Sequence, residues 1–102
     1  MAVGFGLMVH YVAIVEEEPN KAVGVWFPDL PGCFSAGDSI EEAMSNARDA
    51  LVTWADVVRL GGQRMPVPRT ILELRADPET ASEIQAYLVA LIPLDEAMHA
   101  AA

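Results

Sequence analysis

The sequence predicts an α+β domain built from an antiparallel β-β-β-α-β sheet with one main helix packed on it. Several short apolar runs, rich in β-branched and aromatic residues, lie between turn signals, which is typical of strands. One longer stretch carries apolar residues at helical spacing instead. The 102 residues, of which 53% are hydrophobic, suit a single packed domain and exclude a disordered chain.

The first two predicted strands are joined by a polar loop. Residues 7–15 (LMVHYVAIV) are apolar, as in a strand that is covered on both faces. Residues 16–21 (EEEPNK) are polar and include a proline, which indicates a hairpin loop. Residues 22–27 form the second strand, which ends before Pro28 because proline cannot donate a hydrogen bond to a neighbouring strand.

A tight turn leads into the third predicted strand, residues 33–37. Residues 30–33 (LPGC) suit a type II turn, since Pro31 presets φ and Gly32 accepts a positive φ. The three strands together form an antiparallel meander.

The main helix is predicted to run from a capping signal to a pair of glycines. Ser39 and Glu42 form a capping box, with Asp38 and Glu41 as the alternative frame. Gly61-Gly62 ends the helix. One apolar stripe should lie across a face of the sheet. Its members are Ile40, Ala43, Met44, Ala47, Leu51, Trp54 and Val58.

The remaining chain alternates between loops and short elements. Residues 63–69 contain two prolines and form a loop, and residues 71–76 follow a further capping box and form a short helix. Residues 77–83 begin with an N-cap and a proline at the first helical position, so they form a helical turn. Residues 87–92 (YLVALI) form the last strand, which Pro93 stops.

The net charge of -9 limits the classes of partner. Residues 1–47 carry a net charge of -6 and residues 76–102 carry -5, whereas residues 48–75 carry +2. Phosphate contacts come from Lys and Arg, so free-standing nucleic-acid binding is disfavoured. The acidic side chains form either an ordinary solvated surface or an electrostatic match to a basic partner.

Cysteine and apolar content indicate a cytoplasmic protein. Cys33 is the single cysteine, which excludes an internal disulfide and fits a reducing compartment. One cysteine and two histidines are too few for a structural zinc site. Apolar runs fall short of the roughly 18 residues of a membrane span, and the start lacks the positive residue of a signal peptide.

The residue pattern favours no catalytic residue, no cofactor and no metal site. His10 lies within an apolar strand, and Cys33 is expected to pack as a small apolar residue. A two-metal nuclease needs several acidic side chains that converge on one site. A turn and two helix caps instead account for the acidic residues Asp29, Asp38 and Glu42. We therefore do not expect an enzyme.

A long, ordered set of residues resembles the HicB antitoxin family. Residues 27–39 (FPDLPGCFSAGDS) carry the PDLPGC signature, and residues 40–43 and 46–51 carry the helix patterns EEA and NAxxAL. The later segments 66–68 (PVP) and 92–94 (IPL) are similar to family positions, so the resemblance covers roughly residues 8–95.

The resemblance implies that residues 1–95 form a partly RNase H-like, toxin-binding domain. Its partner would be a HicA-like toxin, a small basic mRNA-cleaving protein, whose active-site surface the antitoxin covers. Family members often carry a C-terminal ribbon-helix-helix or helix-turn-helix module that binds DNA. Here residues 96–102 form only a short tail without Lys or Arg, so we expect no DNA-binding module and no direct DNA binding by this chain.

The expected toxin contacts lie in two segments, the acidic hairpin and the turn before the third strand. They are Glu16, Glu17, Glu18, Asp29, Leu30, Pro31, Gly32 and Phe34. The alternative is structural: the turn itself needs Pro31 and Gly32, and Phe34 belongs to the core.

Two other functions stay open beside the antitoxin. Exposed strand edges on a small sheet invite self-pairing, so the chain would be a homo-oligomer, a dimer or tetramer, and an orphan HicB-like binding module without a toxin. The third interpretation is a metal-dependent nuclease, which the placement of the acids disfavours.

Overall fold

The first strand, β1 (Met8–Glu16), is buried over five consecutive residues because both of its faces are covered. Tyr11, Ala13 and Val15 face the main helix, whereas Val12 and Ile14 face two short helices on the other side. The expectation of a strand covered on both faces is confirmed.

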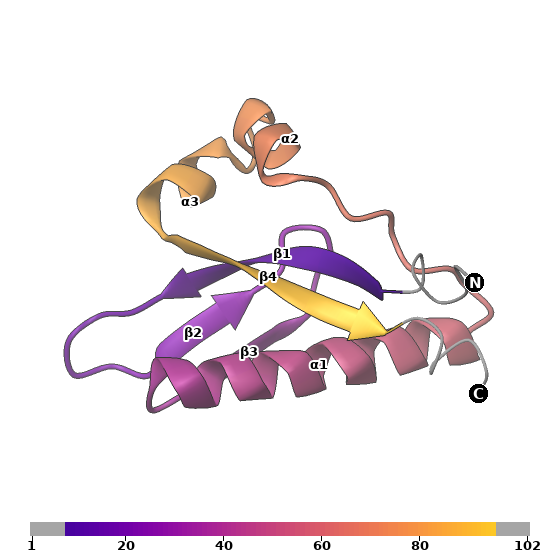
Figure 1. Ribbon diagram of the computed structural model, residues 1–102, viewed down its shortest axis with the longest axis horizontal. Coiled ribbons are helices and arrows are strands. Elements are labelled where there is room, and N and C mark those ends of the chain that lie inside the picture. The colour runs from indigo at the N-terminus through magenta and orange to yellow at the C-terminus, as the bar shows by residue number, and fades with distance from the viewer. Residues whose placement is uncertain (1–7, 96–102) are drawn as a thin grey trace, which may run out of the picture.

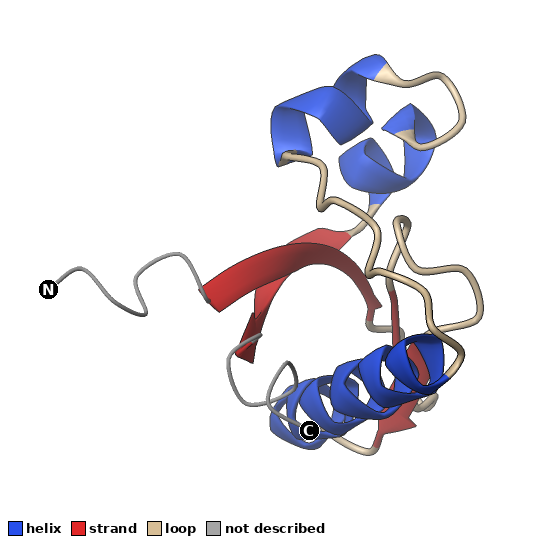
Figure 2. Cartoon of the chain, turned by 90° about the vertical axis from the view of Figure 1, so that its right-hand side faces the viewer, coloured by secondary structure: helices blue, strands red, loops and turns tan. Residues whose placement is uncertain are grey.

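A computed structural model describes residues 8–95 of the protein. Its sheet is antiparallel, with four strands in the order β3-β2-β1-β4. Figures 1 and 2 show the long helix α1 on one side of the sheet and the short helices α2 and α3 on the other. The predicted α+β fold is confirmed. The other elements are β2 (Val23–Trp26), β3 (Phe34–Gly37), α1 (Ile40–Leu60), α2 (Ile71–Ala76), α3 (Ala81–Ala86) and β4 (Leu88–Asp95).

Small side chains let α1 lie close to the sheet. Ala43, Ala47 and Leu51 of the predicted stripe are fully buried, as is Ala55, which the prediction omits. The other members are only partly buried: Ile40, Met44, Trp54 and Val58. A Cβ on Gly37 would lie 2.5 Å from the backbone nitrogen of Ala43, so only glycine allows β3 to end against the start of α1.

The N-cap of α1 follows the Ser39–Glu42 frame rather than the alternative frame of Asp38 and Glu41. The hydroxyl of Ser39 accepts a hydrogen bond from the backbone N–H of Glu42 at 3.1 Å. The Glu42 carboxylate in turn accepts one from the backbone N–H of Asp38 at 2.6 Å. At the other end Gly62 adopts a φ of 78°, which satisfies the last carbonyl groups of the helix.

Two elements, β4 and α3, have boundaries that differ by more than one residue from those predicted. β4 continues through Pro93 to Asp95, because this strand lies at the sheet edge, where a missing backbone N–H can be tolerated. Asp77 caps a turn by accepting from the N–H of Glu79 at 2.9 Å, and the following helix starts only after Thr80. The predicted capping box before α2 is confirmed.

A second, smaller core joins α2 and α3 to the outer face of the sheet. Leu74 and Ile84 pack against the β1 side chains that face away from α1. The indole N–H of Trp26 donates to the Glu83 carboxylate at 2.9 Å, and its ring meets that of Tyr87 edge-on. No helix in the described part of the chain is long and apolar enough to cross a membrane.

Candidate functional site

The two predicted contact segments lie at opposite ends of β2. Glu16 to Glu18 lie in the β1–β2 hairpin, whereas residues 29–34 form the connection from β2 to β3. Figure 1 shows the hairpin at the left end of the molecule and the second connection behind the sheet. The structure therefore separates the predicted site into two surfaces.

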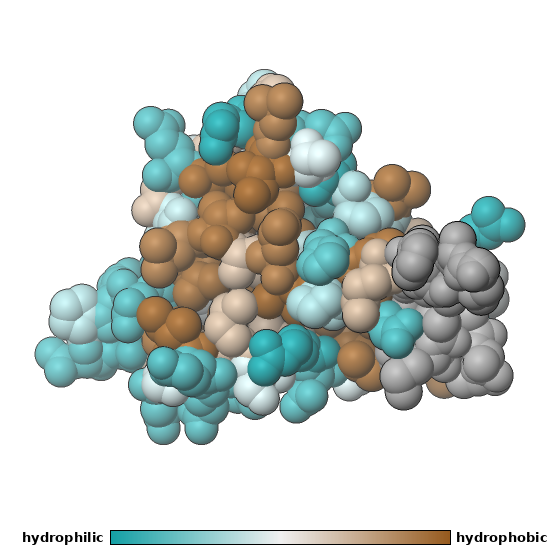
Figure 3. Space-filling view, in the orientation of Figure 1, coloured by the Kyte–Doolittle hydropathy of each residue, from teal (hydrophilic) through white to brown (hydrophobic). Residues whose placement is uncertain are grey.

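The hairpin lies beside the first turn of α1, and together they form what we call the acidic end. A shallow pocket there is lined by Glu17, Glu18 and Asp38, with Lys21 as its basic residue. Figure 3 shows hydrophilic side chains gathered at this end. The acidic end comprises six carboxylates, those of Glu16, Glu17, Glu18, Asp38, Glu41 and Glu42.

Hydrogen bonds within the hairpin set the order in which its carboxylates take up protons. A hydrogen bond that the protonated Glu16 carboxyl donates to Glu18 raises the pKa of Glu16 above its ordinary value, and partial burial adds to the effect. Hydrogen bonds with Lys21 and Glu16 lower the pKa of Glu18, whose carboxylate lies 3.1 Å from the Lys21 ammonium. Glu16 therefore takes up a proton before Glu18 as the pH falls.

The connection from β2 to β3 is a type II turn, as predicted. The backbone N–H of Cys33 donates to the carbonyl of Leu30 at 2.9 Å, and Gly32 has a φ of 85°. The Leu30 side chain is fully buried in the main core, whereas Pro31 and Gly32 are exposed. The tip of the turn is therefore exposed to solvent, whereas its leucine is part of the core.

Asp29 is engaged within the fold. Its carboxylate accepts from the backbone N–H and the Nε–H of Arg69, both at 2.7 Å, and its side chain is 7% exposed. The same guanidinium reaches Asp77 at 2.8 Å. The carboxylate thereby ties the turn before β3 to the loop that leads into α2, which is a structural role.

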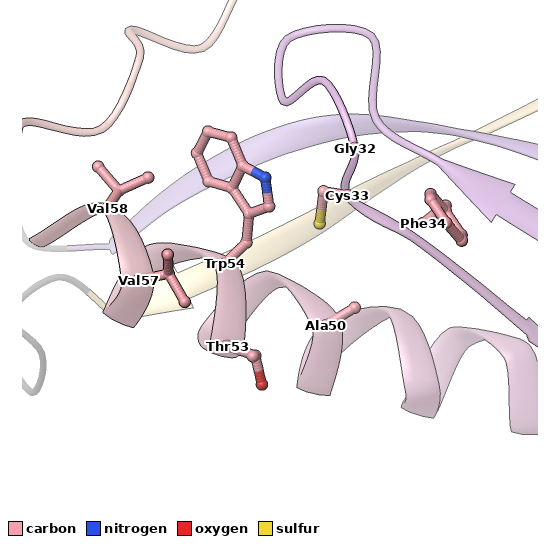
Figure 4. A pocket seen from close by; sticks show the side chains of 8 residues that line it. All are labelled: Gly32, Cys33, Phe34, Ala50, Thr53, Trp54, Val57 and Val58. Atoms are coloured by element: carbon pink, nitrogen blue, oxygen red, sulfur yellow. The ribbon is translucent and has the colours of Figure 1, made fainter. Parts of the chain in front are cut away.

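Phe34 is not a core residue: its side chain is 70% exposed and lines a groove between the edge of β3 and α1. Figure 4 shows this β3 groove, which has a volume of about 510 Å³. Its lining residues are Gly32, Cys33, Phe34, Ala50, Thr53, Trp54, Val57 and Val58. The indole N–H of Trp54 donates to the carbonyl of Pro31 at 3.2 Å, so the helix holds the turn in place.

The helix side of the β3 groove was missed by the sequence analysis, which placed Trp54 and Val58 only in the core stripe. A signal exists, because Ala50 and Val57 widen the apolar face of α1 beyond what β2 and β3 cover. The wide apolar face of α1 indicates a groove only if β3 is short, because a longer strand would bury these residues.

Burial and spacing limit what the thiol and the metal-ligating side chains of the described residues can do. Burial raises the pKa of the Cys33 thiol to about 11, so it is neutral near pH 7 and a poor nucleophile. Within residues 8–95, no three His, Cys, Asp or Glu side chains gather in a way that could hold a metal ion. The two surfaces that stand out are an acidic end and an apolar groove.

Sequence comparison identifies the family of the chain. Residues 11–101 match the model of the HicB-like antitoxin of bacterial toxin–antitoxin systems. The antitoxin HicB 2 of Photorhabdus laumondii is 44% identical over 54 residues, which are 53% of this chain and 39% of that protein. An uncharacterised 14.9 kDa protein of Haemophilus phage HP1 is 32% identical over 79 residues, 78% of this chain and 56% of that protein. The chain thus spans about half the length of these relatives.

Solved structures that share this fold include HicB antitoxins. The antitoxin HicB of Burkholderia pseudomallei is similar with a TM-score of 0.68 and 29% identity, covering 82% of this chain and 61% of that one. The isolated N-terminal domain of a Burkholderia pseudomallei HicB gives a TM-score of 0.70 and 30% identity, covering 85% of this chain and 99% of the domain. The described residues therefore correspond to that N-terminal domain.

Proposed function

The chain belongs to the HicB-like antitoxin family of bacterial toxin–antitoxin systems, and we propose that it neutralises a small basic HicA-like toxin. It would act in the cytoplasm, without catalysis, by covering the active-site surface of this mRNA-cleaving protein. The observation that carries the proposal is the acidic end, where six carboxylates from two separate segments face solvent beside a single lysine.

Charge explains how such a surface would select its partner. Opposite potentials on two proteins raise the rate of their encounter and disfavour partners of like charge. A ribonuclease must carry basic side chains to hold RNA phosphates, so an acidic surface competes directly for the same groups. By the same reasoning, we propose that residues 8–95 do not bind DNA themselves.

Burial and ion pairing within the fold reduce the set of residues that we propose as toxin contacts. We propose Glu16, Glu17 and Glu18 as electrostatic contacts, and the exposed Pro31, Gly32 and Phe34 as apolar ones. We leave out Leu30, because it is buried, and Asp29, because its carboxylate is bound to Arg69.

Co-expression with the HicA-like protein encoded beside this gene tests the proposal. We expect the chain to restore growth and to copurify with the toxin. The variant Glu17→Lys/Glu18→Lys should weaken binding by about tenfold or more, since close charge pairs can contribute several kcal/mol to a complex. A control of equal net charge is Gln63→Lys/Glu79→Lys/Gln85→Lys, whose exposed positions lie away from the acidic end.

Three results would contradict the proposal. They are the absence of a HicA-like reading frame beside the gene, a toxin that neither binds nor loses toxicity, and equal weakening by the two lysine variants. The last result would show that net charge alone, rather than the acidic end, governs the association.

A homo-oligomeric binding module is the second candidate, and the outer edge of β4 favours it. Leu72, Leu88 and Leu91 are each more than half exposed, and Figure 3 shows an apolar surface where α2, α3 and β4 lie. We propose that this surface joins copies of the chain into a dimer or tetramer. Leu91→Glu should then yield monomers in light scattering, whereas the exposed control Leu60→Glu on α1 should not. A wild-type monomer would refute it.

A further inference from the structure

We propose that the β3 groove receives an extended segment of the toxin, which pairs with the edge of β3 and inserts an apolar side chain beside α1. This inference rests on the proposed function and names the chemistry of its contact: an extended, basic segment with an apolar anchor. Such strand addition draws affinity from backbone hydrogen bonds and specificity from pockets for alternate side chains.

Hydrogen bonds show which backbone groups of β3 face outward. The carbonyl of Cys33 accepts from the N–H of Phe27 at 3.3 Å, so these opposite residues form a hydrogen-bonded pair. In an antiparallel ladder such pairs alternate along the strand. The next hydrogen-bonded position is therefore Ser35, opposite Val25. The N–H and C=O groups of Phe34 consequently point away from β2, toward the open edge.

The two halves of the β3 edge differ. The carbonyl of Ala36, which also points outward, accepts a hydrogen bond from the side-chain amide of Asn46 on α1 at 2.8 Å. The hydroxyl of Ser35 donates to the carbonyl of Ala43 at 3.3 Å. Side chains thus close the half of β3 near the start of α1, while the half at Phe34 opens onto the groove.

The walls of the groove suit an apolar side chain. Phe34 and Val57 line it from the strand and from the helix, with 70% and 65% of their surfaces exposed. Figure 4 shows Cys33 and Trp54 between them, with Trp54 nearer to Val57. Because the Trp54 indole is held by the turn carbonyl, this wall is in place before a partner arrives, which lowers the entropic cost of binding.

Charge along the groove selects a basic occupant. Glu42, Asp49 and Asp56 are exposed at seven-residue intervals on α1, so they form a row with about 10 Å between neighbours. Asp49 lies four residues before the groove residue Thr53 and Asp56 lies three residues after it, so both are its neighbours on the surface of α1.

The other flank of α1 carries the opposite charge. Arg48 and Arg59 are about half a turn away from the groove residues Ala50 and Val57, given about 100° per residue. Asp56 is already engaged within the fold, so the charge offered to a partner on this flank comes from Glu42 and Asp49. A second copy of the chain, with its net charge of -9, is a poor occupant, whereas a segment of a basic toxin is complementary.

Amide hydrogen exchange on the complex of the full chain with the HicA-like toxin tests the pairing directly. The Phe34 amide should exchange quickly in the free protein, since it faces solvent, and should become protected about tenfold or more in the complex. Val57→Glu should weaken the complex by about tenfold or more. The matched control Val67→Glu, at a position that is 85% exposed outside the groove, should leave affinity within about twofold.

Two variants at one position separate the side chain from the backbone. Phe34→Ala removes the ring and keeps the N–H, whereas Phe34→Pro removes both; proline is tolerated where an edge N–H faces solvent. We expect proline to weaken binding more than alanine, with both variants checked for wild-type circular dichroism. If Phe34→Pro does not fold, the exchange measurement decides alone.

The outcomes separate the two proposals. A complex in which the Phe34 amide stays unprotected and Val57→Glu binds like the wild type would overturn the groove inference and leave the antitoxin function standing. A wild-type chain that binds no HicA-like toxin would overturn the proposed function itself.

Discussion

The two edges of the sheet differ in the charge that surrounds them. The edge at β3 adjoins an apolar groove and a row of carboxylates on α1, including Asp49 and Asp56. The edge at β4 carries no charged residue from Leu88 to Leu94 and exposes leucines. Both edges offer backbone groups for pairing, so charge rather than geometry distinguishes the site proposed for a basic protein from the site proposed for a second copy.

The contrast begins with how each edge is held. At β3, glycine and hydrogen bonds bring the strand against the long helix α1. At β4, the neighbouring cover is the smaller α2–α3 unit, which leaves apolar side chains such as Leu72 at the surface. A loop that contains Arg69 and binds Asp29 links the two sides of the sheet.

The largest effect is expected from Gly37→Ala, which separates β3 from α1. The added Cβ would lie 2.5 Å from the Ala43 nitrogen and 2.9 Å from its Cα, and backbone atoms cannot move aside cheaply. We expect a loss of about 3 kcal/mol in the free energy of unfolding, measured by urea denaturation. Gly24→Ala in β2 is the matched control, because nothing lies within 4 Å of its added Cβ. Equal stability of both variants would contradict the close approach.

Asp29→Asn should have the next largest effect, since it breaks the link between the turn before β3 and the loop into α2. The variant replaces a carboxylate that is 7% exposed and accepts two hydrogen bonds from Arg69. Hydrogen bonds to charged groups contribute about 1.5–3 kcal/mol, so we expect a loss of about 2 kcal/mol. Asp49→Asn, exposed on α1, serves as the control and should change stability by less than about 0.5 kcal/mol. A stable Asp29→Asn variant would show that the link is dispensable.

Association with the toxin and self-association through β4 should depend differently on salt concentration. Raising NaCl from about 50 to about 300 mM should slow association with the toxin by about tenfold, because exposed charges are screened. Self-association through the β4 surface should be unchanged or stronger, since apolar contacts are not screened. Association rates from stopped-flow fluorescence and sedimentation of the free chain provide the two measurements. A toxin association rate that is independent of salt would contradict the role of the acidic end.

The smallest effect is a dependence of stability on pH through Asp77. A hydrogen bond from the Glu79 backbone, followed by one from Arg69, lowers the pKa of this carboxyl in the folded chain. A lowered folded pKa means that the contribution to stability is present above the unfolded value of 3.8 and is lost as the pH falls through the folded value. The wild type should therefore be more stable than Asp77→Asn at about pH 6, and this difference should shrink as the pH falls below 3.8. A difference that persists in acid would show another cause.

Much of the fold could be predicted because its signals are local. The turn at Pro31-Gly32, the Ser39 cap and the apolar stripe of α1 each depend on residues within a few positions of one another. The end of the last strand was mistaken at Pro93, because tolerance of proline depends on whether the strand lies at an edge. Whether a strand lies at an edge depends on the order of the strands in the sheet, and the residues of the strand itself do not reveal it.

The candidate site was predicted less completely than the fold. The acidic hairpin was recognised from its composition, but its neighbourhood with Asp38 was not, because the two segments are about twenty residues apart in sequence. Asp29 was expected at the surface, yet its partner Arg69 lies forty positions away. Phe34 was placed among the contacts with a core position as the alternative, and its 70% exposure removes that alternative.

By itself the sequence determined the elements, their order, the excess of acid and the resemblance to the HicB antitoxins, which the family match confirms. These features depend on composition and on spacing over a single turn or strand. Only the tertiary structure decided which carboxylates stay free for a partner, which edge is apolar, and where a groove opens beside Phe34. Those properties arise from packing between distant segments, where a shift of one strand or one ion pair moves a side chain from surface to interior.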